Sequence, residues 1–171
     1  MKTTTLFILS VLLVFNGYSA PSNVHWSRLT TGDETMTSTK GVVLKGSDKL
    51  ISPNSFHPPV EITIVAKTDS TNLRIGYAAD QVIFNWEENL DQLRVDGGPA
   101  GNRQADGAGR IPKDKFVMIQ WQVTPEHQAI YVDGKLRFEH SGNYSRIDNP
   151  VSIFPASGSV VTVKSISITK Q

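Results

Sequence analysis

The residues best suited to chemistry in this sequence are a tryptophan and its polar neighbours. Trp86 directly follows Asn85, and Arg74 and Arg94 lie in neighbouring apolar runs. An indole can stack on a pyranose ring while amide and guanidinium groups bind the sugar's hydroxyls. Two alternatives stay open. Apolar residues occupy both parities of the run 81–86, QVIFNW, so Trp86 could be a core residue, and the arginines could belong to a solvated face.

The carboxylates do not form the pair that glycoside hydrolysis requires. Two carboxyl groups must flank the scissile bond, roughly 5–10 Å apart. The nearest group is Glu87, Glu88 and Asp91 in WEENLD. Adjacent glutamates on a strand point to opposite faces. No serine lies in a Gly-x-Ser-x-Gly turn either. We therefore expect no catalytic residue and predict that the protein is not an enzyme.

No metal site is indicated by spacing. The chain has no cysteine, and its histidines show no pairing of the kind that binds zinc. They are His25, His57, His127 and His140. Loop carboxylates such as Asp80, Asp96 or Asp106 could hold a structural calcium ion, although no spacing demands one. We expect no other cofactor.

The overall charge does not select a polyanionic partner. The formal net charge is +1, which steers the protein toward neither nucleic acid nor an anionic membrane. We therefore expect a glycan or an extracellular protein as partner, recognised by shape and local chemistry. The stretch 97–115 contains five glycines together with Arg103 and Arg110. An irregular loop of that length is either functional or mobile, and Arg103 joins the candidate ligand-binding residues.

The N-terminus has the pattern of a secretory signal peptide. Lys2 precedes an apolar run of about ten residues, shorter than the roughly twenty that span a bilayer, and small residues follow. Cleavage after Ser19 places small residues at the recognition positions, which favours it over cleavage after Ala20. We expect residues 1–19 to be the signal peptide, 20–40 to lead into the domain, and 41–171 to form it. No membrane span then remains.

The expected compartment is extracellular, or periplasmic if the source is bacterial. Asn143-Tyr144-Ser145 is a glycosylation sequon, which matters only in a eukaryote. The absence of cysteine leaves the domain to be held by its core, and about 150 residues are enough for one core.

Apolar residues recur with period two, and no amphipathic helix is visible. Strands are expected at 61–67 and 116–123, with Trp121 favoured as a core residue. Asp133-Gly134 has the chemistry of a type I′ hairpin turn. The last run, 159–169, should pair with the strand around 42–44. About ten to twelve short strands predict an all-β protein, a two-sheet antiparallel β-sandwich of jelly-roll type.

The segment 115–138, KFVMIQWQVTPEHQAIYVDGKLRF, together with the closing VVTVKSISI, resembles the concanavalin A-like lectin and glucanase superfamily, which includes laminin G-like domains. The resemblance implies a jelly roll that commonly binds carbohydrate or extracellular protein. The Glu-x-Asp-x-x-Glu arrangement of its glycoside hydrolases is absent here, as is the His-x-Asn-x-Arg motif of galectins. We expect a secreted, non-catalytic, lectin-like module. A laminin G-like protein-interaction module is the alternative, and an enzyme acting on glycosides is less favoured.

Overall fold

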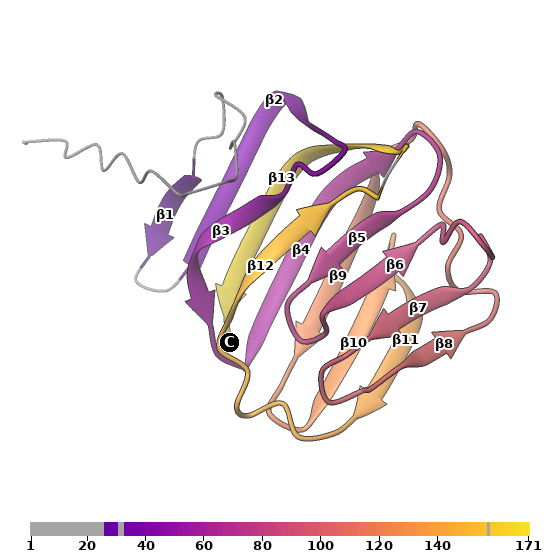
Figure 1. Cartoon of the computed structure of the whole chain (residues 1–171). Coiled ribbons are helices and arrows are strands. Elements are labelled where there is room, and N and C mark those ends of the chain that lie inside the picture. The colour runs from indigo at the N-terminus through magenta and orange to yellow at the C-terminus, as the bar shows by residue number, and fades with distance from the viewer. Residues whose placement is uncertain (1–25, 31–32, 157) are drawn as a thin grey trace, which may run out of the picture.

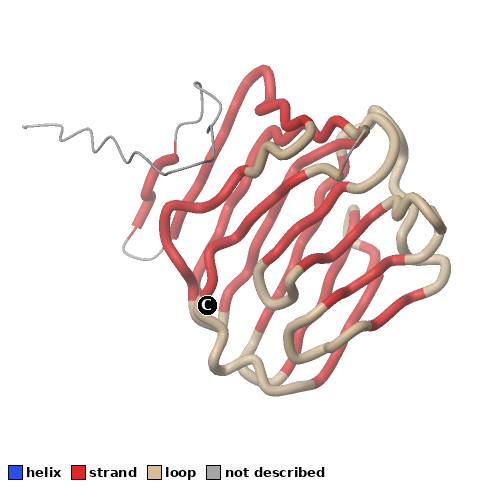
Figure 2. Tube along the Cα trace, viewed as in Figure 1, coloured by secondary structure: helices blue, strands red, loops and turns tan. Residues whose placement is uncertain are grey.

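The computed structural model describes residues 26–30, 33–156 and 158–171. None of these residues is helical, and they form thirteen strands in two sheets that pack face to face (Figures 1 and 2). Every strand pairing is antiparallel. The predicted all-β two-sheet sandwich is therefore confirmed.

We call the six-stranded sheet the front sheet and the seven-stranded sheet the back sheet, after their places in Figure 1. In spatial order, the front sheet consists of β3 (Leu50–Phe56), β12 (Asn149–Phe154), β5 (Leu73–Gly76), β6 (Gln81–Phe84), β7 (Leu93–Asp96) and β8 (Arg103–Ala105). The back sheet consists of β1 (Trp26–Thr30), β2 (Asp33–Lys45), β13 (Val160–Lys170), β4 (Val60–Thr68), β9 (Val117–Val123), β10 (His127–Val132) and β11 (Lys135–Ser141).

Alternation along the strands builds the core between the sheets. On β4, Ile62, Ile64 and Ala66 are fully buried while the residues between them are partly exposed. Side chains at alternate positions point to opposite faces of a sheet, so one face of β4 faces the front sheet. Trp121 on β9 is buried as predicted, and its indole Nε1–H donates to Gln128 Oε1 at 2.9 Å.

The predicted hairpin and the predicted closing strand are both present. Asp133 and Gly134 have φ values of 48° and 76°, and the positive φ at both positions is what a type I′ turn requires. The C-terminal strand β13 pairs with β2, placing Val161 opposite Leu44. β13 also pairs with β4 on its other side, which makes it a central strand of the back sheet.

Several elements differ from the sequence-based expectation. The thirteen described strands exceed the expected ten to twelve, because β1, β3 and β8 were not anticipated. β8 lies inside the stretch 97–115 that was expected to be irregular throughout. The back sheet includes residues 26–30 and 33–40 of the segment expected to lead into the domain. The expected signal peptide lies outside the described residues. The described residues contain no helix of the length and apolarity needed to cross a bilayer.

Candidate functional site

The outer face of the front sheet carries a row of large side chains that crosses its strands. Leu73 and Ile75 belong to the core, so Arg74 between them points outward. The pairing register then places Arg74 beside Ile83 on β6, and Ile83 beside Arg94 on β7. Phe154 and Gln104 extend the row at its two ends. The two arginines predicted as ligand-binding residues thus share one face.

A continuous set of hydrogen bonds joins these two arginines. Arg74 Nη1 donates to Gln81 Oε1 at 3.0 Å, and Gln81 Nε2 donates to Asp96 Oδ2 at 2.9 Å. Asp96 Oδ1 accepts from Arg94 Nε at 2.9 Å. Asn72 Oδ1 also accepts from Arg74. Three neighbouring strands therefore hold both guanidinium groups in place without a ligand.

Trp86 lies in the connection that follows β6, next to this network. The Arg94 guanidinium stacks on its ring, 4.6 Å from the centroid. Trp86 is partly exposed and lies outside the inter-sheet core. The alternative that Trp86 is a core residue is therefore wrong. The next residue, Glu87, accepts from Arg74 Nη2 at 3.5 Å. The loop after β6 is thus tied to both arginines.

Ile83 forms an apolar floor under the site. It is 1% exposed, yet it does not belong to the inter-sheet core cluster, in contrast to Val82 and Phe84 on either side of it. Its register neighbours across the sheet are Arg74 and Arg94. The burial of Ile83 on the outer face is therefore due to the side chains gathered above it.

Two other predicted ligand-binding residues lie elsewhere. Asn85 is only 2% exposed, and its side chain is used internally. Its Nδ2 donates to the carbonyls of Ser70 and Ile111, and its Oδ1 accepts from the Ile111 N–H at 2.8 Å. Arg103 pairs with Val95, a core residue, so strand parity places it on the opposite face from Arg94. Neither Asn85 nor Arg103 therefore presents its side chain with Arg74 and Arg94.

The glycine-rich stretch 97–115 is anchored at one side of this site. Arg110 contacts Asp91 through Nε at 2.6 Å, and this hydrogen bond holds the pKa of Asp91 below its ordinary value. Arg137 on β11 donates to the Ala108 carbonyl at 3.2 Å. A cavity of about 430 Å³ is lined in part by Leu90, from the loop after β6, and by Pro112, from the stretch 97–115. The stretch is therefore tied to the loop after β6 through Arg110 and to β11 through the Ala108 carbonyl.

Sequence reasoning missed Gln81, Asp96 and Glu87. Gln81 and Asp96 pair directly across β6 and β7, and each lies two residues from the outward row, so strand parity contained the signal for both. The sequence predicted Glu87 only as one of two adjacent glutamates on a strand. It lies in the loop after β6 instead, so the strand-parity argument against a carboxylate pair does not apply to it.

The carboxylates expected to be able to hold calcium are mostly engaged with protein groups. Asp96 binds Gln81 and Arg94, while Asp106 Oδ1 accepts from Gln92. Asp80 is exposed. Among the described residues, no group of three His, Cys, Asp or Glu side chains is arranged to hold a metal ion.

The described histidines are separate from the site and each has its own neighbour. His57 lies 3.3 Å from Asp148, His127 lies 3.6 Å from Glu139, and His140 Nδ1 is 2.7 Å from the Tyr144 hydroxyl. The sequon residue Asn143 is exposed, and its Oδ1 accepts from Ser145 Oγ at 2.7 Å. Glycosylation at Asn143 in a eukaryotic source stays a prediction.

Comparison with solved structures shows which folds this chain resembles. Galectin LEC-6 of Caenorhabditis elegans aligns over 84% of this chain and 99% of its own, with a TM-score of 0.55 and 12% identity. The β-glucanase of Bacillus licheniformis aligns over 85% and 82%, with a TM-score of 0.56 and 10% identity. The exoplasmic/lumenal domain of VIP36, in a form bound to Ca²⁺ and mannose, aligns over 80% of both chains, with a TM-score of 0.58 and 7% identity. No protein-family model and no curated protein matches the sequence.

These neighbours correct the prediction that the protein is not an enzyme. The same two-sheet fold is found in lectins and in glycoside-cleaving proteins such as the glucanase. The prediction was wrong to infer the absence of activity from strand parity at two glutamates that are not on a strand. The fold is compatible with carbohydrate binding and with glycoside chemistry alike.

Proposed function

We propose, from the premise that this chain has the concanavalin A-like lectin and glucanase fold of its structural neighbours, that the outer face of its front sheet binds carbohydrate. The observation that carries the proposal is the stack of Arg94 on Trp86 within the hydrogen-bonded row from Arg74 to Asp96. A partly exposed indole beside fixed polar groups suits a sugar ring, which has apolar C–H faces and a hydroxyl rim.

The donors left free support this assignment. In the described part of the chain, Arg94 uses its Nε–H on Asp96, so the N–H groups of its terminal nitrogens remain for a ligand. The side chain of Arg94 is 33% exposed. Because Asp96 and Trp86 already fix the guanidinium, a ligand does not have to order it, and this lowers the entropic cost of binding.

We further propose that the protein acts as a secreted, lectin-like module whose partner is a glycan. Recognition of a neutral sugar fits the site, because both arginines already have carboxylate neighbours, Glu87 and Asp96. Paired charges of this kind bind hydroxyls by hydrogen bonding without requiring an anionic ligand.

The test is a glycan-array screen of the protein with the Trp86→Ala variant. We expect the variant to lose at least about tenfold in affinity, because it removes the stacking surface. Tyr131→Ala is the matched control, since Tyr131 is a partly exposed aromatic residue on the outer face of the back sheet. Its binding should be unchanged, and both variants should keep the wild-type melting temperature.

A well-folded wild-type protein that binds no glycan would contradict the proposal and favour the laminin G-like protein-interaction function. Binding that persists in the Trp86→Ala variant would place the sugar site elsewhere on the molecule.

A further inference from the structure

The back sheet contains an interruption in register at Lys164. On β13, Val163 pairs with Val42 of β2, and Ser165 pairs with Thr37. One residue of β13, Lys164, therefore faces the four residues 38–41 of β2. The pairing of β13 with β4 also skips Lys164. Such bulges redirect side chains and are frequent at functional sites.

The sequence carries a trace of this bulge. The buried residues of β13 are Val161, Val163, Ile166 and Ile168, so the period of two is broken once, between Val163 and Ile166. The extra residue keeps both halves of the strand facing the core and leaves Lys164 exposed on the outer face. The bulge therefore presents a cation without any loss of core packing.

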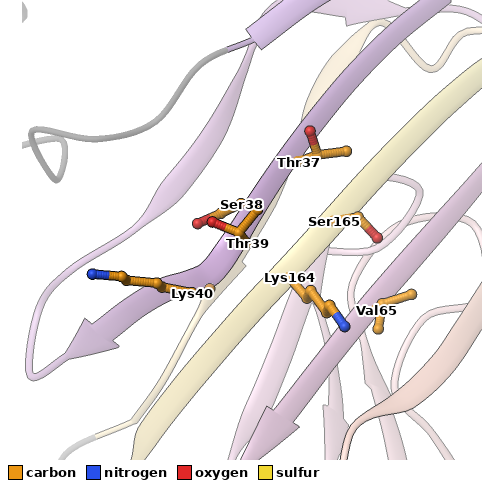
Figure 3. A pocket seen from close by; sticks show the side chains of 8 residues that line it. Thr37, Ser38, Thr39, Lys40, Val65, Lys164 and Ser165 are labelled. Carbon is orange, nitrogen blue, oxygen red and sulfur yellow. The ribbon is translucent and has the colours of Figure 1, made fainter.

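A cavity of about 750 Å³ opens at the interruption. Its wall contains the hydroxyls of Thr37, Ser38, Thr39 and Ser165, with Lys40 and Lys164 beside them. Figure 3 shows Lys164 extending toward Val65 on β4. Lys40 extends in the opposite direction, beyond Ser38 and Thr39. The cavity therefore has hydroxyl groups on its wall and a cation on each side.

A third cation lies next to this cavity. Lys67 Nζ and Lys164 Nζ lie 5.5 Å and 5.8 Å from the centroid of the Phe116 ring. The side chain of Phe116 is 37% exposed. None of the ion pairs found among the described residues includes a lysine. Both ammonium groups lie close to the same ring, so an anion that approaches both would be stabilised by their charge.

We propose that this surface, made of Lys40, Lys67, Lys164 and the hydroxyl-lined cavity and called here the lysine face, binds the sulfate groups of an acidic polysaccharide. Ammonium groups supply the charge, and serine and threonine hydroxyls donate hydrogen bonds to sulfate oxygens. A cavity of about 750 Å³ with hydroxyls on its wall favours a chain that can enter it over a lipid surface. The lysine face lies on the opposite sheet from the Trp86 site, so the inference does not depend on the proposed function.

The experiment measures binding of a heparin-derived oligosaccharide to the protein by calorimetry at low and at physiological salt. The Lys67→Gln/Lys164→Gln double variant removes both charges and keeps an unbranched polar side chain at each position. We expect at least about a tenfold loss of affinity, because the variant removes two charge-assisted contacts to the ligand. Wild-type affinity should also fall as salt rises.

Two controls separate this site from the first. Lys170→Gln changes an exposed lysine at the far end of β13 and should bind as the wild type does. Trp86→Ala should likewise keep its heparin affinity. Unchanged affinity in the double variant would overturn the proposal, as would a wild type that binds no heparin. A wild type that binds vesicles containing phosphatidylserine but not heparin would overturn it in favour of a membrane. Loss of heparin binding in Trp86→Ala would also overturn the proposal, because heparin would then bind at the Trp86 site.

Discussion

The two outer faces of the sandwich place cations next to an aromatic ring in different ways. On the front sheet, Arg94 stacks on Trp86 and also binds Asp96. On the back sheet, Lys67 and Lys164 lie near Phe116, and neither forms an ion pair within the described residues. One face therefore has its charges matched internally, and the other does not.

The two faces can therefore recognise different ligands. A guanidinium held by a carboxylate keeps a fixed geometry and offers directed N–H groups, which suits hydroxyls. An ammonium without a carboxylate partner contributes mainly charge, which suits an anion and is weakened by salt. The near-neutral net charge of the chain thus conceals two surfaces of different electrostatic character.

The largest expected effect distinguishes the two faces by stability. Ile83→Ala should lower the free energy of unfolding by about 2–4 kcal/mol, because Ile83 is fully buried even though it lies on an outer face. Met118→Ala, on the outer face of the back sheet, should cost less than about 1 kcal/mol, because Met118 is 38% exposed. Urea unfolding of both variants is the measurement. Similar losses in the two would show that the side chains above Ile83 do not form a packed layer.

Ile83 also shows why the sequence did not settle the facing of Trp86. An apolar residue on each parity of β6 is compatible with a strand buried on both sides or with an apolar floor under polar side chains. The positions of Arg74 and Arg94 on the adjacent strands show that Ile83 is a floor under polar side chains. The order of strands in a sheet cannot be deduced from the local spacing of residues. In β4 and β13 one face is polar, so those strands were predicted correctly.

Asn85 and Lys164 show two further limits of sequence reasoning. Asn85 was a reasonable sugar ligand by residue type, yet its amide satisfies buried backbone groups of a segment 26 positions away. That partner depends on tertiary packing. Lys164 was included in a strand expected to alternate regularly, and the single break in its period was not used. The partner of Asn85 cannot be deduced from a single sequence, whereas the break at Lys164 can be.

An intermediate effect is expected from removing the carboxylate that joins the front-sheet network. Asp96→Ala takes away the acceptor of both Arg94 Nε and Gln81 Nε2. The Asp96 side chain is 14% exposed, so its partners are left poorly solvated, and we expect a loss of about 1–3 kcal/mol in thermal or urea unfolding. Lys164→Gln is the matched control on the back sheet and should leave stability unchanged. A stable Asp96→Ala variant would mean that water replaces the carboxylate at little cost.

The smallest effect concerns a carboxylate close to the lysine face. Asp69 lies two residues beyond Lys67, and its Oδ1 accepts from the Val160 backbone N–H at 2.9 Å. This hydrogen bond holds the pKa of Asp69 below its ordinary value. Asp69 is thus engaged in joining the end of β4 to the start of β13, which explains why it does not pair with Lys67.

The sign of the pH dependence follows from that lowered pKa. A carboxyl group whose pKa is depressed in the folded state stabilises the fold above its unfolded pKa, near about 4, and this contribution is lost as the pH falls through the folded value. Asp69→Asn keeps an oxygen acceptor but cannot titrate. Melting temperatures measured from pH 5 down to about 2 should therefore fall less steeply for the variant than for the wild type. Parallel plots of melting temperature against pH would mean that the Asp69 carboxylate binds water in place of the Val160 N–H. Its charge would then be available to neutralise the lysine face, and the two faces would differ less in electrostatic character.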